Sequence, residues 1–258
     1  MPLFLGVIIL SLIEGFTEFL PISSTGHLIL FSSFFRIEST EFWKSFEIAI
    51  QLGALLSVIV LYWRKLAFDR LLLLKVLVSF IPTAVIGWSF YKLIKGYLME
   101  NVQVVLWALL IGGILIILFE ISRLSRKYAF NGNRELTWSQ AFLVGVCQSL
   151  AVIPGVSRSA ATILGGLLLG VDRKAIVEFS FLLAIPTIAS AAAYDFIKSS
   201  VNFTPNEFGL LMLGFALSFL TAILAVRFLL GFIQTRNFIP FGVYRILLAL
   251  IFWFVLIR

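Results

Sequence analysis

Six long apolar segments constrain this sequence more than any other feature. They cover approximately residues 48–63, 71–91, 102–121, 175–197, 208–232 and 239–257. A helix crosses the hydrocarbon core of a bilayer with roughly 20 apolar residues, and only a backbone that satisfies its own hydrogen bonds can do so. The sequence therefore predicts an all-α integral membrane protein with six transmembrane helices.

The composition excludes a soluble globular domain. Hydrophobic residues make up 61% of the chain and charged residues 13%, whereas soluble domains carry about 25% charged residues. So little polar surface implies an exterior that faces lipid. The net charge of +7 then reports membrane orientation, and no nucleic-acid partner is expected.

Two further apolar regions are interrupted by polar residues. Residues 3–13 run into a polar stretch before apolar sequence resumes at 28–35, and 141–153 are likewise broken before 160–169. Irregular backbone at membrane depth persists only where protein covers it or where it lines a cavity. Each region therefore predicts a re-entrant helix-loop-helix hairpin.

The order of a hairpin and three transmembrane helices occurs twice. It predicts a first repeat at 1–121, a cytoplasmic linker at 122–136 and a second repeat at 137–258. Pro21 and Ser24 align with Pro154 and Ser157. Three membrane crossings invert the second repeat, so an inverted-topology repeat is predicted, with the two hairpin tips meeting near the midplane.

The Lys and Arg residues divide unequally between the two predicted membrane faces. One face has ten of these residues and the other has six. The ten are Arg64, Lys65, Arg70, Arg123, Arg126, Lys127, Arg134, Arg173, Lys174 and Arg236. Because cytoplasmic loops are enriched in Lys and Arg, we expect this face in the cytoplasm and both termini outside it.

The first hairpin contains an unusual group of polar residues. Glu14 and Glu18 are four residues apart and share a helical face, where two carboxylates repel each other unless a cation, a proton or an arginine is near. Three hydroxyl residues and the only histidine follow: Ser23, Ser24, Thr25 and His27. A helix cap explains one of these hydroxyls, and the free N–H groups of a helix start form an anion site.

The second hairpin contributes an arginine to a similar loop. Residues 154–162 read Pro-Gly-Val-Ser-Arg-Ser-Ala-Ala-Thr and include Ser157, Arg158 and Thr162. A guanidinium offers a fork of donors that suits phosphate oxygens. Arg245 lies deep in the last segment and is either a phosphate contact or part of an ion pair. These groups suit phosphoryl transfer, which depends mainly on positioning and charge stabilisation.

The two loops also carry a family resemblance. Residues 14–27, Glu-Gly-Phe-Thr-Glu-Phe-Leu-Pro-Ile-Ser-Ser-Thr-Gly-His, resemble the first signature of the bacterial undecaprenyl-pyrophosphate phosphatase family, also known for bacitracin resistance. Residues 154–159 resemble its second signature, and 178–186 and 238–245 are similar to family sequence. The resemblance covers essentially the whole chain. Ala160 stands where the family pattern leads us to expect glycine.

This resemblance implies an enzyme of the bacterial inner membrane that removes the terminal phosphate of undecaprenyl pyrophosphate and so recycles the lipid carrier of cell-wall synthesis. Glu14 and Glu18 would hold a divalent cation, Mg²⁺ or Ca²⁺. Ser24 would be the nucleophile or a phosphate ligand, His27 an acid, base or nucleophile, and Arg158 the residue that holds the pyrophosphate. Supporting phosphate contacts would come from Ser23, Thr25, Ser157, Thr162 and Arg245.

Two questions stay open at this point. A serine nucleophile needs an adjacent base, and His27 is a candidate, but a metal-bound water is an alternative nucleophile. A lipid-phosphate flippase would use similar architecture and the same arginine. The glutamate pair beside Ser24 and His27 favours hydrolysis, because transport alone has little use for a metal and a base. The expected partners are the polyprenyl pyrophosphate and the bilayer, and a homodimer is left open.

Overall fold

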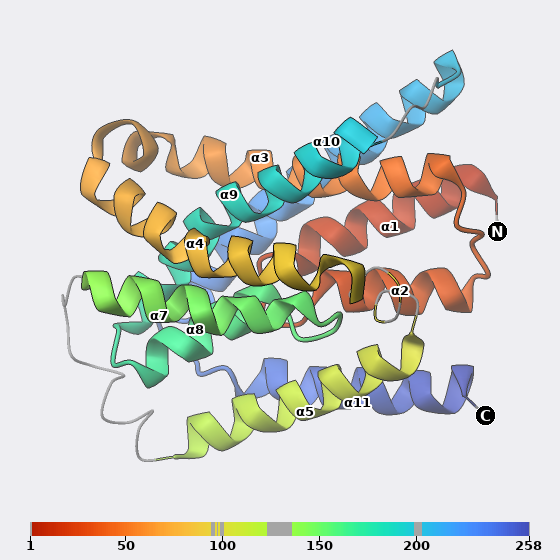
Figure 1. Cartoon of the computed structure of the whole chain (residues 1–258). Helices are drawn as coiled ribbons and strands as arrows, with labels where there is room; N and C mark the ends of the chain where they lie inside the picture. Colours follow the sequence, from red (N-terminus) through yellow and green to blue (C-terminus); the bar gives the residue numbers. More distant parts are fainter. Residues whose placement is uncertain are drawn as a thin grey trace.

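The computed structural model describes residues 2–93, 96, 98, 101–122, 136–198 and 203–257. These residues form helices and connecting loops without a β-strand (Figure 1). Among them, six helices are long and apolar enough to cross a membrane, which confirms the predicted number. They are α3 (Glu41–Phe68), α4 (Arg70–Leu93), α5 (Val102–Ile121), α9 (Arg173–Lys198), α10 (Pro205–Phe232) and α11 (Ile239–Leu256).

Shorter helices occupy the two interrupted regions. The first contains α1 (Leu3–Thr17) and α2 (Ser24–Phe34); the second contains α7 (Trp138–Gln148), the 3₁₀ helix η2 (Ser149–Val152) and α8 (Arg158–Leu168). In Figure 1, α2 runs back beside α1 and α8 runs back beside α7. The predicted linker at 122–136 lies, apart from its first and last residues, outside the described residues.

The helices α2 and α8 begin with the same local structure. The side chain of Ser23 accepts a hydrogen bond from the N–H of Gly26, and the side chain of Ser157 accepts one from Ala160, each at 3.2 Å. Both serines have positive φ, 72° and 76°, a region that residues other than glycine rarely adopt. The equivalent of Ser157 is therefore Ser23 and not Ser24, which shifts the sequence alignment of the loops by one residue.

The helices pack through small residues. A Cβ atom on Gly145 of α7 would lie 1.9 Å from the carbonyl oxygen of Ser79 in α4, and one on Gly15 of α1 would lie 2.5 Å from that of Ser218 in α10. Such residues let the backbones of membrane helices approach closely. As a result, α7 packs against α4 and α1 packs against α10, while α3 contacts α9 and α5 contacts α11.

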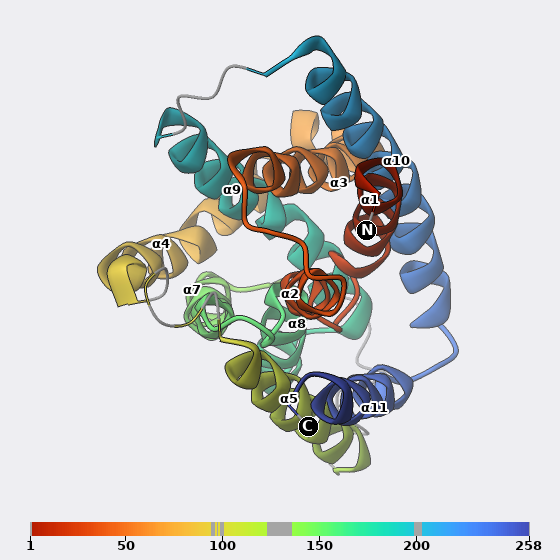
Figure 2. The same cartoon turned by 90° about the vertical axis from the view of Figure 1, so that its right-hand side faces the viewer.

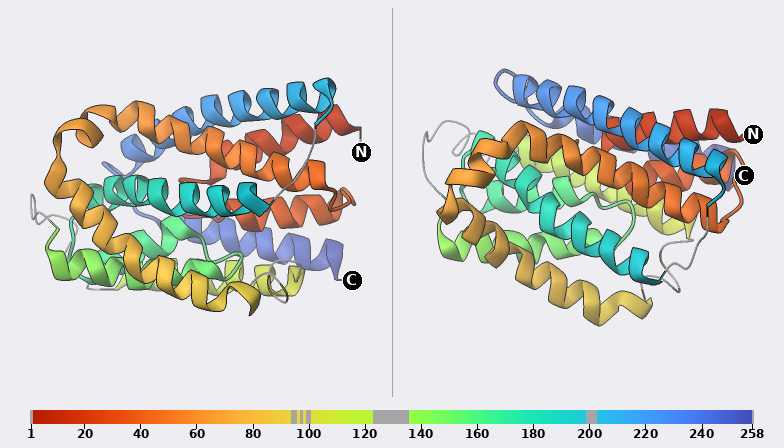
Figure 3. Two further views of the ribbon diagram at one scale, coloured as in Figure 1. Left: turned by 45° about the horizontal axis from the view of Figure 1, so that its top comes forward. Right: turned by 90° about the horizontal axis from the view of Figure 1, so that it is seen from above.

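The first loop, residues 18–25 including the start of α2, and the second loop, residues 153–159 including the start of α8, meet in the interior of the bundle. Viewed along the bundle, α2 and α8 lie in the middle and the longer helices surround them (Figure 2). Ser159 of the second loop donates a hydrogen bond of 2.7 Å to the carbonyl of Leu20 in the first. Both views in Figure 3 place the N- and C-termini at the same end of the molecule.

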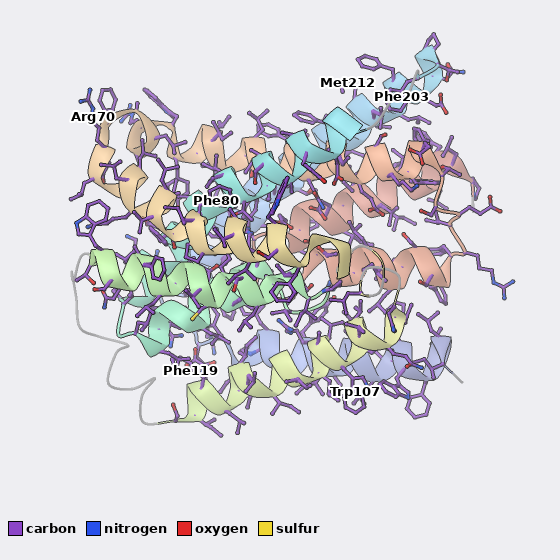
Figure 4. All side chains as sticks on the ribbon, in the orientation of Figure 1. Arg70, Phe80, Trp107, Phe119, Phe203 and Met212 are labelled. Atoms are coloured by element: carbon purple, nitrogen blue, oxygen red, sulfur yellow. The ribbon has the colours of Figure 1, made fainter. Side chains whose placement is uncertain are left out.

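Large apolar side chains cover the outside of the bundle. Trp107 on α5 is half exposed, at 51%, and projects outward (Figure 4). Trp88 on α4 is 75% exposed. Many other large hydrophobic side chains are exposed as well, and exposed apolar surface on this scale marks contact with another apolar phase. The exterior therefore fits a lipid environment, as the composition predicts.

Candidate active site

A cavity of about 250 Å³ lies where the two loops meet α3 and α9. Its polar lining combines residues from four elements. These are Glu18, Ser23, Ser24 and Thr25 of the first loop, Ser157 and Arg158 of the second, Gln51 of α3 and Thr187 of α9. Six of these eight residues are predicted site residues, so the fold brings most of the predicted site together.

Glu18 connects the two loops at this cavity. Its Oε2 accepts a hydrogen bond from the hydroxyl of Ser24, and its Oε1 lies 3.3 Å from Nη2 of Arg158. Ser24 is the first residue of α2, and Arg158 is the first residue of α8. The hydroxyl of Ser24 therefore lies beside a carboxylate that can accept its proton, and an adjacent base of this kind can activate a hydroxyl for nucleophilic attack.

Other contacts fix the guanidinium of Arg158. Its Nη1 donates to the carbonyl of Ser180 in α9 at 2.7 Å, and its Cζ lies 5.7 Å from the centroid of the Phe19 ring. Its Nε–H is buried and has no acceptor among the described residues. Since a buried donor without a partner is costly, this N–H is available to an oxygen of a bound ligand.

Glu14 lies on α1, four residues before Glu18, and is fully buried. Neither of its carboxylate oxygens has a hydrogen-bond partner among the described residues. The charges that act on it are those of Glu18, Glu47 and Arg158. An unpaired buried carboxylate is strongly unfavourable, so Glu14 needs a proton or a cation. Glu18 keeps free lone pairs beside its two contacts, so both carboxylates have oxygen atoms that could bind a cation. No group of three or more His, Cys, Asp or Glu side chains that could hold a metal occurs in the part of the chain that the structure describes.

His27 does not reach the cavity. Its side chain is buried, with Nδ1 2.7 Å from the carbonyl oxygen of Ser23 and Nε2 2.7 Å from the hydroxyl of Tyr244. Because a carbonyl only accepts, Nδ1 carries a proton. Burial disfavours the charged imidazole, so the ring is neutral and its Nε2 accepts a hydrogen bond from the Tyr244 hydroxyl. The structure thus leaves no ring nitrogen free to act on a ligand in the cavity.

Two predicted phosphate contacts also lie outside the cavity lining. The hydroxyl oxygen of Thr162 lies 2.8 Å from the carbonyl oxygen of Arg158 and 3.2 Å from Oε1 of Gln148, and either can accept its proton. Arg245 is 0% exposed, and its guanidinium donates to backbone carbonyls. These belong to Pro21, Ala108, Leu109, Gly155 and Val156. The sequence left a phosphate contact or an ion pair open for Arg245, and the structure shows a set of carbonyl contacts instead.

The sequence analysis missed three polar residues near the cavity. Gln51 and Thr187 line it, and Glu47 acts on the buried Glu14. A usable signal exists for two of them, because Glu47 and Gln51 are four residues apart and share a face of α3. Counting the apolar segment from residue 48 left Glu47 outside the predicted transmembrane helix.

The fold and the cavity define a multi-pass helical membrane protein in which a serine and an arginine at two helix starts meet a carboxylate at the end of a third helix. Comparison with known proteins assigns the family. Residues 7–251 match the family model described as bacitracin resistance protein BacA. The chain belongs to this family.

Several relatives extend over nearly the whole chain. A protein of Sulfurihydrogenibium sp. is 47% identical over 249 residues, 96% of this chain and 98% of the relative. A protein of Aquifex aeolicus is 48% identical over 95% of each chain. One from Campylobacter jejuni is 47% identical over 97% of this chain and 93% of its own. All three are named undecaprenyl-diphosphatase.

Proposed function

We propose that this protein hydrolyses undecaprenyl diphosphate to undecaprenyl phosphate and inorganic phosphate in the bacterial inner membrane, and so returns the lipid carrier to cell-wall synthesis. One observation carries the proposal. The hydroxyl of Ser24 donates a hydrogen bond to Glu18, which also forms an ion pair with Arg158, and all three residues line one cavity. The names of the relatives agree with this reaction.

The reaction begins at Ser24. Its Oγ attacks the terminal phosphorus, Glu18 takes the hydroxyl proton, and the bond from that phosphorus to the bridging oxygen breaks. Undecaprenyl phosphate leaves with the bridging oxygen, to which Glu18 passes the proton. A water then attacks the phosphoserine while Glu18 takes one of its protons, the bond from phosphorus to Oγ breaks, and Glu18 returns the proton to Oγ, which releases phosphate and the free serine. Arg158 holds the phosphate oxygens and opposes the charge that develops on them.

The remaining lining of the cavity supports a lipid substrate. It is apolar and comes from η2, the three residues after it, and α9. These residues are Ala151, Val152, Ile153, Pro154, Gly155, Ile188 and Ala191. Ile153 is 38% exposed and Ala191 is also exposed, so the apolar wall includes side chains that a lipid chain can reach. A prenyl chain can therefore remain in lipid while its diphosphate enters the polar half.

A divalent cation, Mg²⁺ or Ca²⁺, belongs to the proposal. Glu14 and Glu18 would hold it, because Glu14 offers two buried oxygens without partners among the described residues. Oxygen ligands are those that these cations prefer. When bound, the cation would neutralise charge on the diphosphate oxygens.

We also propose that α1–α2 and α7–α8 are re-entrant hairpins of an inverted repeat comprising residues 1–121 and 137–258. The reciprocal packing supports it. The helix α1 of the first half contacts α10, the second long helix of the second half, and α7 of the second half contacts α4, the second long helix of the first half. The matched serine caps of α2 and α8 agree with it. By the Lys and Arg distribution, both termini lie outside the cytoplasm.

The test is phosphate release from undecaprenyl diphosphate by the purified protein in detergent and in liposomes. We expect stoichiometric formation of undecaprenyl phosphate, and excess EDTA should suppress it. Movement of the lipid between leaflets without phosphate release would instead identify a flippase. The hydrogen bond from Ser24 to Glu18 favours hydrolysis, since transport requires no activated hydroxyl.

A further inference from the structure

We infer that Tyr244 and Arg245 of α11 are positioning residues that turn backbone N–H groups of both loops toward the diphosphate. This rests on the proposed function and assigns a role to a segment, residues 238–245, that the hydrolysis itself does not use. Neither side chain lines the cavity. Both act through groups that do.

Arg245 binds both loops at once. Its Nη1 donates to the carbonyl of Val156 at 3.0 Å and lies 3.4 Å from that of Pro21, while Nη2 donates to Gly155 at 2.9 Å. Nη2 and Nε also reach the carbonyls of Ala108 and Leu109 in α5. Only a guanidinium has enough fixed donors to connect three segments in this way.

Because the peptide bonds are trans, each carbonyl that Arg245 holds also fixes the direction of the N–H group of the next residue. The described residues contain no cis peptide, and in a trans peptide the C=O and the following N–H point in opposite directions. When Arg245 holds the carbonyl of Val156, the N–H of Ser157 points away from Arg245. Ser157 is the N-cap of α8 and lines the cavity, so its N–H is directed to the side where the phosphate binds.

Tyr244 does the same for the first loop through His27. The Tyr244 hydroxyl donates to Nε2 of His27, whose Nδ1 donates to the carbonyl of Ser23. The two rings are also stacked, with centroids 5.6 Å apart and planes 8° from parallel. Holding the carbonyl of Ser23 orients the N–H of Ser24, the next residue. The first N–H groups of a helix have no acceptor within it and bind anions well.

A glycine makes room for the guanidinium and offers a specific test. A Cβ atom on Gly112 of α5 would lie 2.1 Å from Nη2 and 2.7 Å from Cζ of Arg245. Gly112→Ala would therefore displace the flexible end of Arg245 from its carbonyls without changing the arginine. Gly87 in α4 has no atom within 4 Å of such a Cβ, so Gly87→Ala is the matched control.

We expect Gly112→Ala to lower kcat for phosphate release at least ~10-fold with KM within about twofold, because oriented N–H groups matter most in the transition state. Gly87→Ala should stay within about twofold of the wild type in both constants. Thermal unfolding in detergent shows whether each variant is folded. A folded Gly112→Ala variant with the wild-type kcat would overturn the role of Arg245.

Tyr244→Phe provides an independent arm, because it removes the hydroxyl but keeps the ring stacked on His27. We expect a loss in kcat of at least ~5-fold, on the scale of one hydrogen bond of about 1 kcal/mol. The inhibition constant of inorganic phosphate should rise by a similar factor. Tyr62→Phe, at a buried tyrosine 8% exposed in α3, should leave both quantities unchanged.

The outcomes separate this inference from the proposed function. A wild-type protein that releases no phosphate from undecaprenyl diphosphate contradicts the function itself. An active wild type together with a Tyr244→Phe variant of unchanged kcat and unchanged phosphate inhibition contradicts only the positioning role. A lowered unfolding temperature with unchanged kinetics shows that Tyr244 contributes to stability alone, and this result also contradicts the inference.

Discussion

Arg158 and Glu18 form an ion pair between two loops that are 140 residues apart in the chain, with Nη2 of the arginine 3.3 Å from Oε1 of the glutamate. In the proposed reaction each loop contributes one half of the chemistry. The first loop would supply the serine and its base, and the second would supply the guanidinium that holds the phosphate. The site exists only when both loops are in place.

The first prediction concerns this ion pair. Arg158→Lys keeps the charge but loses the planar fork, so kcat should fall at least ~100-fold, the scale of removing one preorganised donor. Arg173→Lys is the control, because Arg173 forms a similar pair with Glu120 at 2.9 Å outside the cavity. Steady-state phosphate release measures both. A loss confined to KM in Arg158→Lys would contradict a transition-state role.

The second prediction concerns His27. If it positions Ser23, His27→Asn, which keeps a donor for the Ser23 carbonyl, should retain clearly more activity than His27→Ala. If the imidazole is instead an acid or base in the reaction, both variants should lose ~10² to 10⁴-fold alike. Comparing kcat for the two variants decides between these roles.

The third prediction concerns the cation. Adding Ca²⁺ or Mg²⁺ should raise the unfolding temperature of the wild type, since a ligand at 100 times its Kd stabilises the folded state by about 2.7 kcal/mol. Glu14→Gln should abolish this rise, while Glu38→Gln, at an exposed loop position, should keep it. The same rise in Glu14→Gln as in the wild type would remove Glu14 from the cation site.

The fourth prediction concerns orientation. In a Cys147→Ala background, a cysteine at Ser39 should react with an impermeant thiol reagent in intact cells. A cysteine at Thr235 should react only after lysis. Both positions are exposed, in the loops between α2 and α3 and between α10 and α11. The opposite pattern would reverse the orientation and leave the helix arrangement unchanged.

The helices were largely predictable because lipid imposes one requirement on each segment. Uninterrupted apolar length identified all six long helices, and α5 has the predicted bounds of Val102–Ile121. The helix α3 begins at Glu41, earlier than predicted, because Thr40 caps it and the apolar count ignores caps. That difference hid Glu47.

The residue types of the site were predictable from the sequence, but which of these residues contact each other was not. Ser24, Glu18 and Arg158 follow from the local sequence and its family resemblance, whereas the base of Ser24 depends on how a loop closes. The sequence suggested His27 as that base. In the structure His27 faces Tyr244, 217 residues further along the chain, a contact that no local pattern encodes. The carbonyl contacts of Arg245 are hidden from the sequence for the same reason.

The most direct test of the central claim compares phosphate release from undecaprenyl diphosphate by the wild type, Ser24→Ala and Glu18→Gln. Ser33→Ala, an exposed hydroxyl at the other end of α2, is the control. Ser24→Ala should lower kcat at least ~10³-fold. A variant that combines Ser24→Ala with Glu18→Gln should lose little more, because a nucleophile and its base act as one unit. A folded Ser24→Ala variant that keeps more than about one tenth of the wild-type kcat, against this expected loss, would contradict the assignment of Ser24 as the nucleophile.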